Sequence, residues 1–258
     1  MKYIYLTALL IIAILSLAIP YFMYDQVTAT ELDQSNLPPS LTHLFGTDDL
    51  GRDLFARVWF GVRISLLVGI AAAILDLMIG VLWGGAAALA GGHIDDLMMS
   101  IADLFNSIPS LMIVILLTLL LGTSIYSIII AIALVGWIPM ARVVRGQIYQ
   151  IKEMEFVTAA KLYGAGFWRI LFYHLLPNTL PAILVTLTLT IPSAIFTEAF
   201  LSFMGLGIQA PLASLGSLTS EGIGAIAYYP WRLFIPGGVL TFILLALNET
   251  LPEKRVLE

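Results

Sequence analysis

Six stretches of the chain are each long and apolar enough to cross a lipid bilayer as a helix. A bilayer core about 30 Å thick requires about 20 mostly apolar residues in helical form. Of the 258 residues, 60% are hydrophobic and only 11% are charged, a balance that would leave a soluble domain with large exposed apolar patches. The sequence therefore predicts an all-α, polytopic membrane protein. Its transmembrane helices are expected at residues 3–23, 64–90, 108–123, 124–140, 179–203 and 231–248.

Two of these stretches need a choice. The first, MKYIYLTALLIIAILSLAIPYF, could be a cleaved signal peptide, but its apolar run is long and no clear A-x-A site follows, which favours an uncleaved transmembrane anchor. The third and fourth are separated only by LGTSIYS, where Gly122, Thr123 and Ser124 permit a turn. A tight helical hairpin is expected there.

The orientation in the membrane follows from the lysines and arginines near the ends of the spans. With the N-terminus in the cytoplasm, eight basic residues lie inside (Lys2, Arg142, Arg145, Lys152, Lys161, Arg169, Lys254 and Arg255) and four outside (Arg52, Arg57, Arg63 and Arg232). Both termini are then predicted to be cytoplasmic. The predicted organisation is a transmembrane anchor at 1–23, an extracellular segment at 24–63, a transmembrane core at 64–248 with a cytoplasmic loop at 141–178, and a cytoplasmic tail at 249–258.

The cytoplasmic loop interrupts the apolar series with a mixed, basic segment. Its helical spacing predicts a short helix with a partly apolar face formed by Phe156, Ala159, Ala160 and Tyr163. Gly164 and Gly166 then permit a turn. The following helical pattern, FWRILFYHLL, reaches Pro177, whose missing N–H and ring oppose the continuation of a straight helix. Such a helix could be held by a partner protein or could lie as an amphipathic segment on the membrane, and spacing alone leaves both interpretations open.

The run TAAKLYGAGFWRILFYHLLP resembles the EAA loop of permease subunits of bacterial ABC importers. The triplet is written with threonine in place of glutamate and the later isoleucine position holds histidine, as in the peptide and nickel branch of these permeases. By this resemblance, contact with an ATPase is expected at Glu155, Thr158, Ala159, Ala160, Gly164, His174 and Pro177.

Two further runs narrow the branch. FGTDDLGRDLFARVWFGVRISL and LTIPSAIFTEAFLSFMGLGIQAP are similar to C-type permeases, and the second is most like oligopeptide permeases. The resemblance implies the type I ABC importer permease fold, in the cytoplasmic membrane of a bacterium. It implies four kinds of partner: a second homologous permease, two cytoplasmic ATPases, an extracellular solute-binding protein and the membrane lipid.

The implied function is to form half of a translocation pathway for oligopeptides or dipeptides, with nickel or a metal chelate as the alternative cargo. The tail after Asn248, ETLPEKRVLE, departs from the family pattern. The chain has no G-x-x-x-x-G-K-[ST] motif, no nucleophile constellation and no nucleic-acid signature. It is therefore predicted to be a transport subunit without a catalytic site or cofactor of its own, and ATP and Mg²⁺ are expected in the partner ATPases.

Several polar residues are candidates for roles in transport. Asp76 lies within the second predicted span and Glu198 within the fifth, where carboxylates are costly and often mark a path or gate. A proton-coupled secondary transporter using these two residues is the rival hypothesis, although no inverted repeats are evident. A packing role is the alternative for each.

Outside the membrane, Asp48, Arg52, Asp53 and Arg57 could dock a binding protein or could form local ion pairs. The three histidines are far apart without ligand spacing, so no metal site is predicted.

Overall fold

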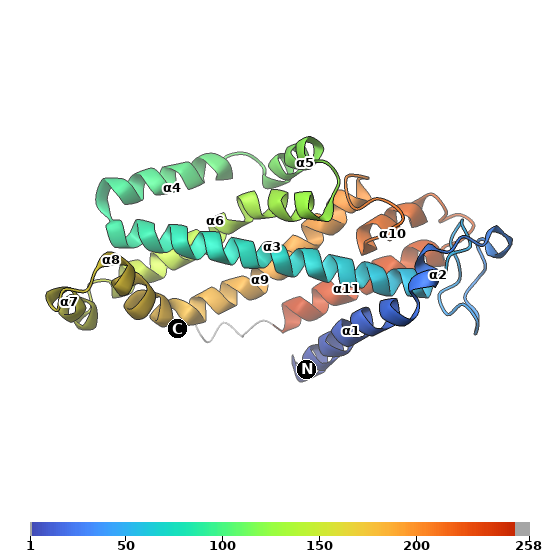
Figure 1. The fold of residues 1–258 in the computed structure, drawn as a ribbon, viewed down its shortest axis with the longest axis horizontal. Helices are drawn as coiled ribbons and strands as arrows, with labels where there is room; N and C mark the ends of the chain where they lie inside the picture. The colour runs from blue at the N-terminus through green and yellow to red at the C-terminus, as the bar shows by residue number, and fades with distance from the viewer. Residues whose placement is uncertain (1, 251–258) are drawn as a thin grey trace. The chain divides into compact units, whose positions relative to one another are not determined.

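The computed structural model describes residues 2–250, which are largely helical (Figure 1). Residues 251–258 of the predicted tail lie outside the described part. The elements are α1 Lys2–Phe22, α2 Tyr24–Thr28, the 3₁₀ helix η1 Leu32–Gln34, α3 Leu54–Ala90, α4 Gly92–Asn106, α5 Ser110–Leu121, α6 Ile125–Ile151, α7 Glu155–Leu162, α8 Phe167–Arg169, the π-helix η2 Ile170–Leu175, α9 Leu176–Phe203, α10 Leu215–Ile223 and α11 Trp231–Glu249.

Within residues 2–250, five helices are long and apolar enough to cross a membrane: α1, α3, α6, the continuous helix Phe167–Phe203 and α11. A sixth span exists only if α4 and α5 are counted together, and these are bent by 79° at their junction. The predicted third span is therefore shorter than expected, since α5 has 12 residues. Pro109 lies at the break, and a proline disfavours helical backbone at the preceding residue.

Three helix ends differ from the predicted spans. α3 begins at Leu54 instead of residue 64, because Leu54, Val58 and Val62 share one helical face and are buried together. α6 extends to Ile151 instead of residue 140, and the fifth span begins upstream of residue 179. The predicted turn at 122–124 lies between α5 and α6, with Gly122 at φ +87°.

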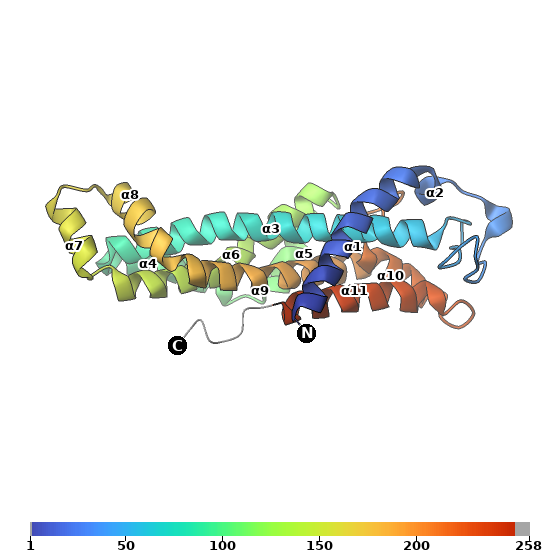
Figure 2. The same ribbon diagram turned by 90° about the horizontal axis from the view of Figure 1, so that it is seen from below.

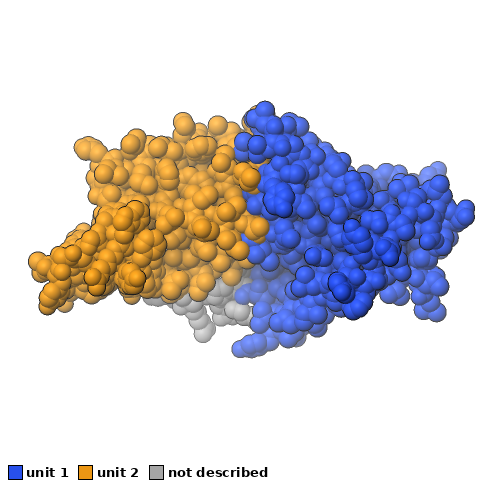
Figure 3. All heavy atoms as spheres, viewed as in Figure 1, with its two compact units in different colours: residues 1–70, 115–129, 192–250 blue, residues 71–114, 130–191, 251–258 orange. Residues whose placement is uncertain are grey.

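The chain forms two compact units (Figure 3). Among the described residues, unit 1 contains 2–70, 115–129 and 192–250. Its apolar core joins the first turns of α3 to α10 and α11 through Val58, Leu215, Leu218 and Ile243. The N-terminal helix α1 lies beside α11 (Figure 2).

Among the described residues, unit 2 contains 71–114 and 130–191. Within it, α3 and α6 approach closely, because a Cβ atom added at Gly84 would collide with the backbone carbonyl of Ala141. Gly80 similarly faces Trp137 and Met140. Small residues allow such close contact between helices in lipid, so these glycines serve packing within the chain.

Candidate functional site

The short helix α7 occupies the predicted loop between α6 and α9. It begins after Met154, whose backbone is extended, with Glu155 in the first turn and Lys161 in the last. These charges complement the partial charges at the two ends of a helix. Gly164 follows with φ +79°, a left-handed conformation that glycine adopts without a steric cost. The sequence therefore specifies both ends of α7 locally.

α7 has one buried and one exposed face. Val157 is fully buried and Ala160 is 9% exposed, whereas Leu162 is 84% and Tyr163 93% exposed. Residues three apart lie on the same side of a helix, which is why Val157 and Ala160 turn inward together. Within residues 2–250, Leu162 and Tyr163 are therefore left largely uncovered.

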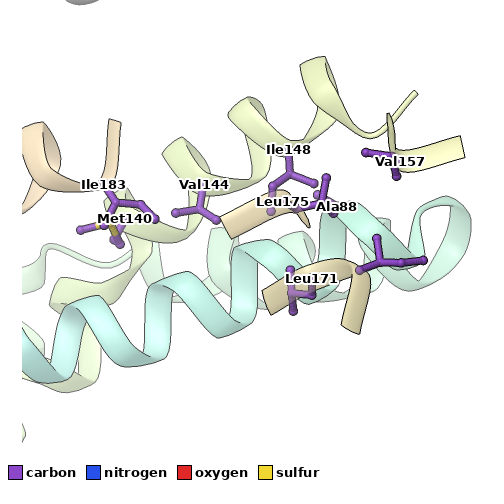
Figure 4. Packing of buried hydrophobic residues seen from close by; sticks show 9 residues of the cluster. Ala88, Met140, Val144, Ile148, Val157, Leu171, Leu175 and Ile183 are labelled. Atoms are coloured by element: carbon purple, nitrogen blue, oxygen red, sulfur yellow. The ribbon is translucent and has the colours of Figure 1, made fainter. Parts of the chain in front are cut away.

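The inward face of α7 is held by an apolar cluster that joins five elements: α3, α6, α7, η2 and α9 (Figure 4). Val157 belongs to the same buried cluster as Ala88 of α3, Ile148 of α6, and Leu171 and Leu175 of η2. Burial of a valine side chain contributes about 1.5–3 kcal/mol. That contribution matters for a helix of eight residues, because an isolated helix of this length is not stable.

The helix that follows the loop does not stop at Pro177. A π-helical stretch, Ile170–Leu175, precedes the proline, and α9 begins at Leu176. The backbone N–H of Leu176 donates to the carbonyl of Leu171, a spacing of five residues. This wider turn accommodates a residue that lacks an N–H. The Asn178 amide also donates to the carbonyl of His174 at 2.6 Å.

The predicted coupling residues do not all face outward. Ala160 is buried against its own chain, and Ala159 and His174 are half-buried. The predicted apolar face is thus divided, with Phe156 and Tyr163 outside and Ala160 inside. The remaining predicted residues are exposed: Glu155, Thr158, Gly164 and Pro177. We refer to the exposed side chains of residues 155–177 as the loop surface.

Aromatic side chains extend the loop surface along α8 and η2. Trp168 and Phe172 stack with ring centroids 5.9 Å apart, and Tyr173 is exposed. Exposed aromatic residues are typical of protein interfaces, where they supply a large contact area with few rotatable bonds. These three residues lie within the predicted helical pattern FWRILFYHLL but were not among the predicted site residues.

A polar cluster beside the loop surface was not predicted. Arg145 donates two hydrogen bonds to the Asp95 carboxylate, each 2.6 Å long, and Tyr149 donates a third of 2.6 Å. The hydrogen bond from Arg145 lowers the pKa of Asp95, which lies outside the predicted spans. Lys152 lies 3.7 Å from the centre of the Tyr149 ring. The sequence contained one indication of this ion pairing. The segment 91–107 is acidic and has no lysine or arginine, and the segment 142–152 is basic.

Glu198 is fully buried in unit 1 and its carboxylate is hydrogen-bonded on both oxygens. Ser65 of α3 donates to Oε2 at 2.8 Å, and Ser202 of α9 donates to Oε1 at 2.7 Å. The bond from Ser65 links α3 to α9, whereas Ser202 lies on the same helix as Glu198. The geometry favours the packing role among the alternatives for this residue.

Asp76 is buried in unit 2, and its Oδ1 atom has no hydrogen-bond partner. Its carboxyl group lies against Gly136 of α6, where an added Cβ atom would collide with it. A side chain at position 136 would therefore force the Asp76 carboxyl group or the two helices to shift. Asp76 and Glu198 belong to different units.

The predicted docking residues of unit 1 form an internal network. Arg52 donates to Asp48 at 2.7 Å. Arg57 donates to the same carboxylate, and it also donates to Glu221, the latter bond being 2.8 Å long. Asp53 accepts from a backbone N–H in the first turn of α3 at 2.9 Å. The four predicted residues are buried, which favours local ion pairing over direct docking. Among residues 2–250, no three His, Asp or Glu side chains are grouped to hold a metal ion.

Comparisons with known proteins agree with this arrangement. Residues 76–250 match the family described as the inner membrane component of binding-protein-dependent transport systems. The chain is 49% identical to the oligopeptide transport system permease protein OppC of Bacillus subtilis, over 94% of this chain and 80% of that protein. It is 48% identical to the dipeptide permease protein DppC of the same organism, over 93% and 75%.

More distant proteins extend the match. OppC of Escherichia coli K12 is 40% identical, over 94% of this chain and 80% of that protein. A solved chain of the MetNI methionine ABC transporter, in an inward-facing conformation, superimposes with a TM-score of 0.61 at 18% identity, over 73% of this chain and 89% of that one. The structural similarity confirms the predicted fold, and the sequence matches confirm the predicted family. The chain is therefore a multi-pass permease subunit of a bacterial ABC transporter and belongs to the family of inner membrane components of binding-protein-dependent transport systems.

Proposed function

We propose that this chain forms half of the translocation pathway of an importer for oligopeptides or dipeptides, driven by ATP and Mg²⁺ in partner ATPases. The names of the relatives that are 49%, 48% and 40% identical support a peptide cargo. Nickel or a metal chelate is the second candidate from the sequence, and none of these three names supports it. The second permease and the two ATPases complete the proposed assembly.

The loop surface is the proposed contact with one ATPase. One observation carries this proposal: α7 is attached through buried Val157 while Leu162 and Tyr163, at its other face and end, are almost fully exposed. An eight-residue helix fixed on one side can move as a rigid body with the elements that hold it. A partner that pushes on α7 therefore acts on α3, α6 and η2 together.

The proposed orientation places both termini and the loop surface in the cytoplasm. It rests on the excess of basic residues predicted on that side. Residues 24–63 then face the external binding protein. Because Asp48, Arg52, Asp53 and Arg57 are buried, we assign them to shaping this segment, and direct contacts to exposed neighbours such as Asp49.

Crosslinking tests the ATPase contact with an unusually clean background, because the chain contains no cysteine. Leu162→Cys is paired with a single cysteine in the groove of the partner ATPase, and the assembled complex is oxidised with and without ATP. We expect a crosslink whose yield changes with nucleotide. Ala159→Cys and Ala160→Cys provide a matched pair, since the same change is made at adjacent positions of different exposure.

The Ala159→Cys and Ala160→Cys pair distinguishes a specific contact with the ATPase from random collision between cysteines. Position 159 should crosslink more than position 160, because Ala160 faces the protein interior. An assembled complex in which no residue of the loop surface crosslinks would disprove the proposed contact. The same single cysteines, labelled from one side of the membrane by an impermeant thiol reagent, test the orientation.

Uptake into vesicles tests the cargo and the energy source. The reconstituted complex and its binding protein are supplied with a labelled tetrapeptide, a labelled dipeptide or a nickel chelate. We expect ATP-dependent peptide uptake that survives collapse of the proton gradient. Uptake that requires the gradient and ignores ATP would instead support the proton-coupled alternative through Asp76 and Glu198.

A further inference from the structure

We propose that Asp95 is a positioning residue that couples α7 to the junction of α3 and α4. It does so by fixing the last turns of α6, which lead directly into α7. The inference rests on the proposed contact between α7 and an ATPase. It assigns a mechanical role to a side chain that is distant in sequence from the resemblance to the EAA loop.

Asp95, Arg145, Tyr149 and Lys152 make a group of contacts that we call the polar clamp. Asp95 is 1% exposed and accepts three hydrogen bonds, two from Arg145 and one from Tyr149. Arg145 and Tyr149 are four residues apart and therefore lie on one face of α6. The paired bonds between the guanidinium and the carboxylate fix direction as well as distance. α6 can therefore neither rotate nor slide past α4 without breaking them.

A second polar contact joins the end of α6 to the end of α3. Lys152 donates to the carbonyl of Ala88 at 3.1 Å, and Ala88 lies in the last turn of α3, where carbonyls lack partners within the helix. The Lys152 ammonium also lies over the Tyr149 ring. Gly91 and Gly92, both with positive φ, form the turn between α3 and α4. The polar clamp thus joins the α3–α4 corner to a residue three positions before α7.

The polar clamp lies next to the buried apolar cluster that contains Val157. Val157 of α7 belongs to the same buried cluster as Ala88 and Ile148. Both lie next to the polar clamp, since Ala88 accepts a hydrogen bond from Lys152 and Ile148 precedes Tyr149 in α6. Apolar contacts resist separation but are not directional, whereas the bonds to Asp95 also resist twisting and sliding. Force applied to α7 is therefore transmitted to the α3–α4 corner only while both contacts hold.

The same two helices offer a natural control. Arg142 of α6 donates to Asp103 of α4 at 2.6 Å, but these side chains are 45% and 65% exposed. Exposed ion pairs contribute little because water and salt screen them. Loss of this pair should leave coupling unchanged, although it changes the charge of α4 in the same way.

The test compares Asp95→Asn with Asp103→Asn in the complete transporter reconstituted in nanodiscs. ATP hydrolysis is measured with and without the peptide-loaded binding protein, and peptide uptake is measured in vesicles. For Asp95→Asn we expect the stimulation of hydrolysis to fall at least fivefold, with fewer peptides transported per ATP. Asp103→Asn should stay within twofold of the wild type on both measures.

Two further variants keep the outcome decisive. The swap of Asp95→Arg with Arg145→Asp should recover part of the stimulation, which a purely local effect on the amount of folded protein would not explain. If Asp95→Asn does not assemble, Tyr149→Phe removes a single hydrogen bond, and a reduced stimulation is expected. An unchanged ratio of transport to hydrolysis in an assembled Asp95→Asn or Tyr149→Phe complex would overturn the inference. A wild-type complex without stimulation by the binding protein would contradict the proposed function instead.

Discussion

Two buried carboxylates in the apolar helices have opposite surroundings. Glu198 accepts hydrogen bonds from Ser65 and Ser202, one at each oxygen. Asp76 has an Oδ1 atom without a partner and lies against Gly136. Both are almost completely inaccessible to solvent, so burial alone does not distinguish them.

The difference lies in how each site uses its carboxyl group. At Glu198 the oxygens connect α3 to α9 and satisfy two hydroxyl groups, so the group contributes to the structure. At Asp76, Gly136 of the neighbouring helix α6 leaves room for the carboxyl group. The Oδ1 atom receives no hydrogen bond. A costly, incompletely satisfied group within an apolar helix is the better candidate for a role in transport.

The largest effect is expected for Gly136→Ala. The new methyl group collides with Asp76, and such overpacking costs about 1–3 kcal/mol. We expect a marked fall in the melting temperature of the purified protein in detergent. Gly146→Ala on the same helix is the matched control, since a Cβ atom there meets nothing within 4 Å. Asp76→Ala combined with Gly136→Ala should recover stability, and failure of this rescue would show that the collision is not with Asp76.

A loss within the same range is expected for Glu198→Ala. Two buried hydroxyl groups lose their acceptor, with a cost of about 2 kcal/mol for unsatisfied polar groups. Denaturation in detergent should show this loss, and Glu198→Gln, which retains one acceptor oxygen, should be milder. Equal stability of Glu198→Ala and the wild type would remove the contrast with Asp76.

Ser65→Ala tests one half of the Glu198 network. A side-chain hydrogen bond between membrane helices contributes about 0.6 kcal/mol on average, so the melting temperature should fall slightly. The double variant with Glu198→Ala should show little additional loss, because the bond is already absent. Additive losses would indicate that Ser65 stabilises the protein through another contact.

The smallest effect on stability is expected for Asp76→Asn. It retains the shape of the side chain, and Oδ1 has no hydrogen bond to lose, so the free energy of unfolding should change by less than about 1 kcal/mol. Peptide uptake per folded complex is the informative measurement. Reduced uptake with unchanged stability would assign Asp76 a role in transport, whereas a large loss of stability would make it a structural group like Glu198.

The membrane helices were predictable because their signal is local. Length and apolar composition located α1, α6 and α11 within the sequence, and the turn residues at 122–124 located the break before α6. The helix α4 was missed because its segment carries three aspartates and was predicted as a loop between spans. The early start of α3 was missed because Arg57 was assigned to the extracellular segment 24–63. Its burial depends on its partners Asp48 and Glu221, of which Glu221 is distant in the sequence.

The loop surface was predictable only in part. The glycine turn and the short helix follow from neighbouring residues, but the direction of Ala160 depends on where Val157 finds its apolar partners. Those partners lie on α3, α6 and η2. The wider π-helical turn likewise allowed the helix to pass Pro177, which no local rule for α-helices includes.

By itself, the sequence determined that the chain is a helical membrane protein, that a basic helical loop interrupts it, and which family it resembles, because length, composition and spacing act over a few neighbouring residues. Only the tertiary structure decided that Asp95 binds Arg145, 50 positions away, that Glu198 is satisfied by Ser65, and that Asp76 lies against Gly136. These pairs form when helices pack. Packing depends on the shape of the whole fold. A buried carboxyl group is tolerated only where a neighbouring helix supplies hydrogen-bond donors or a small residue beside it.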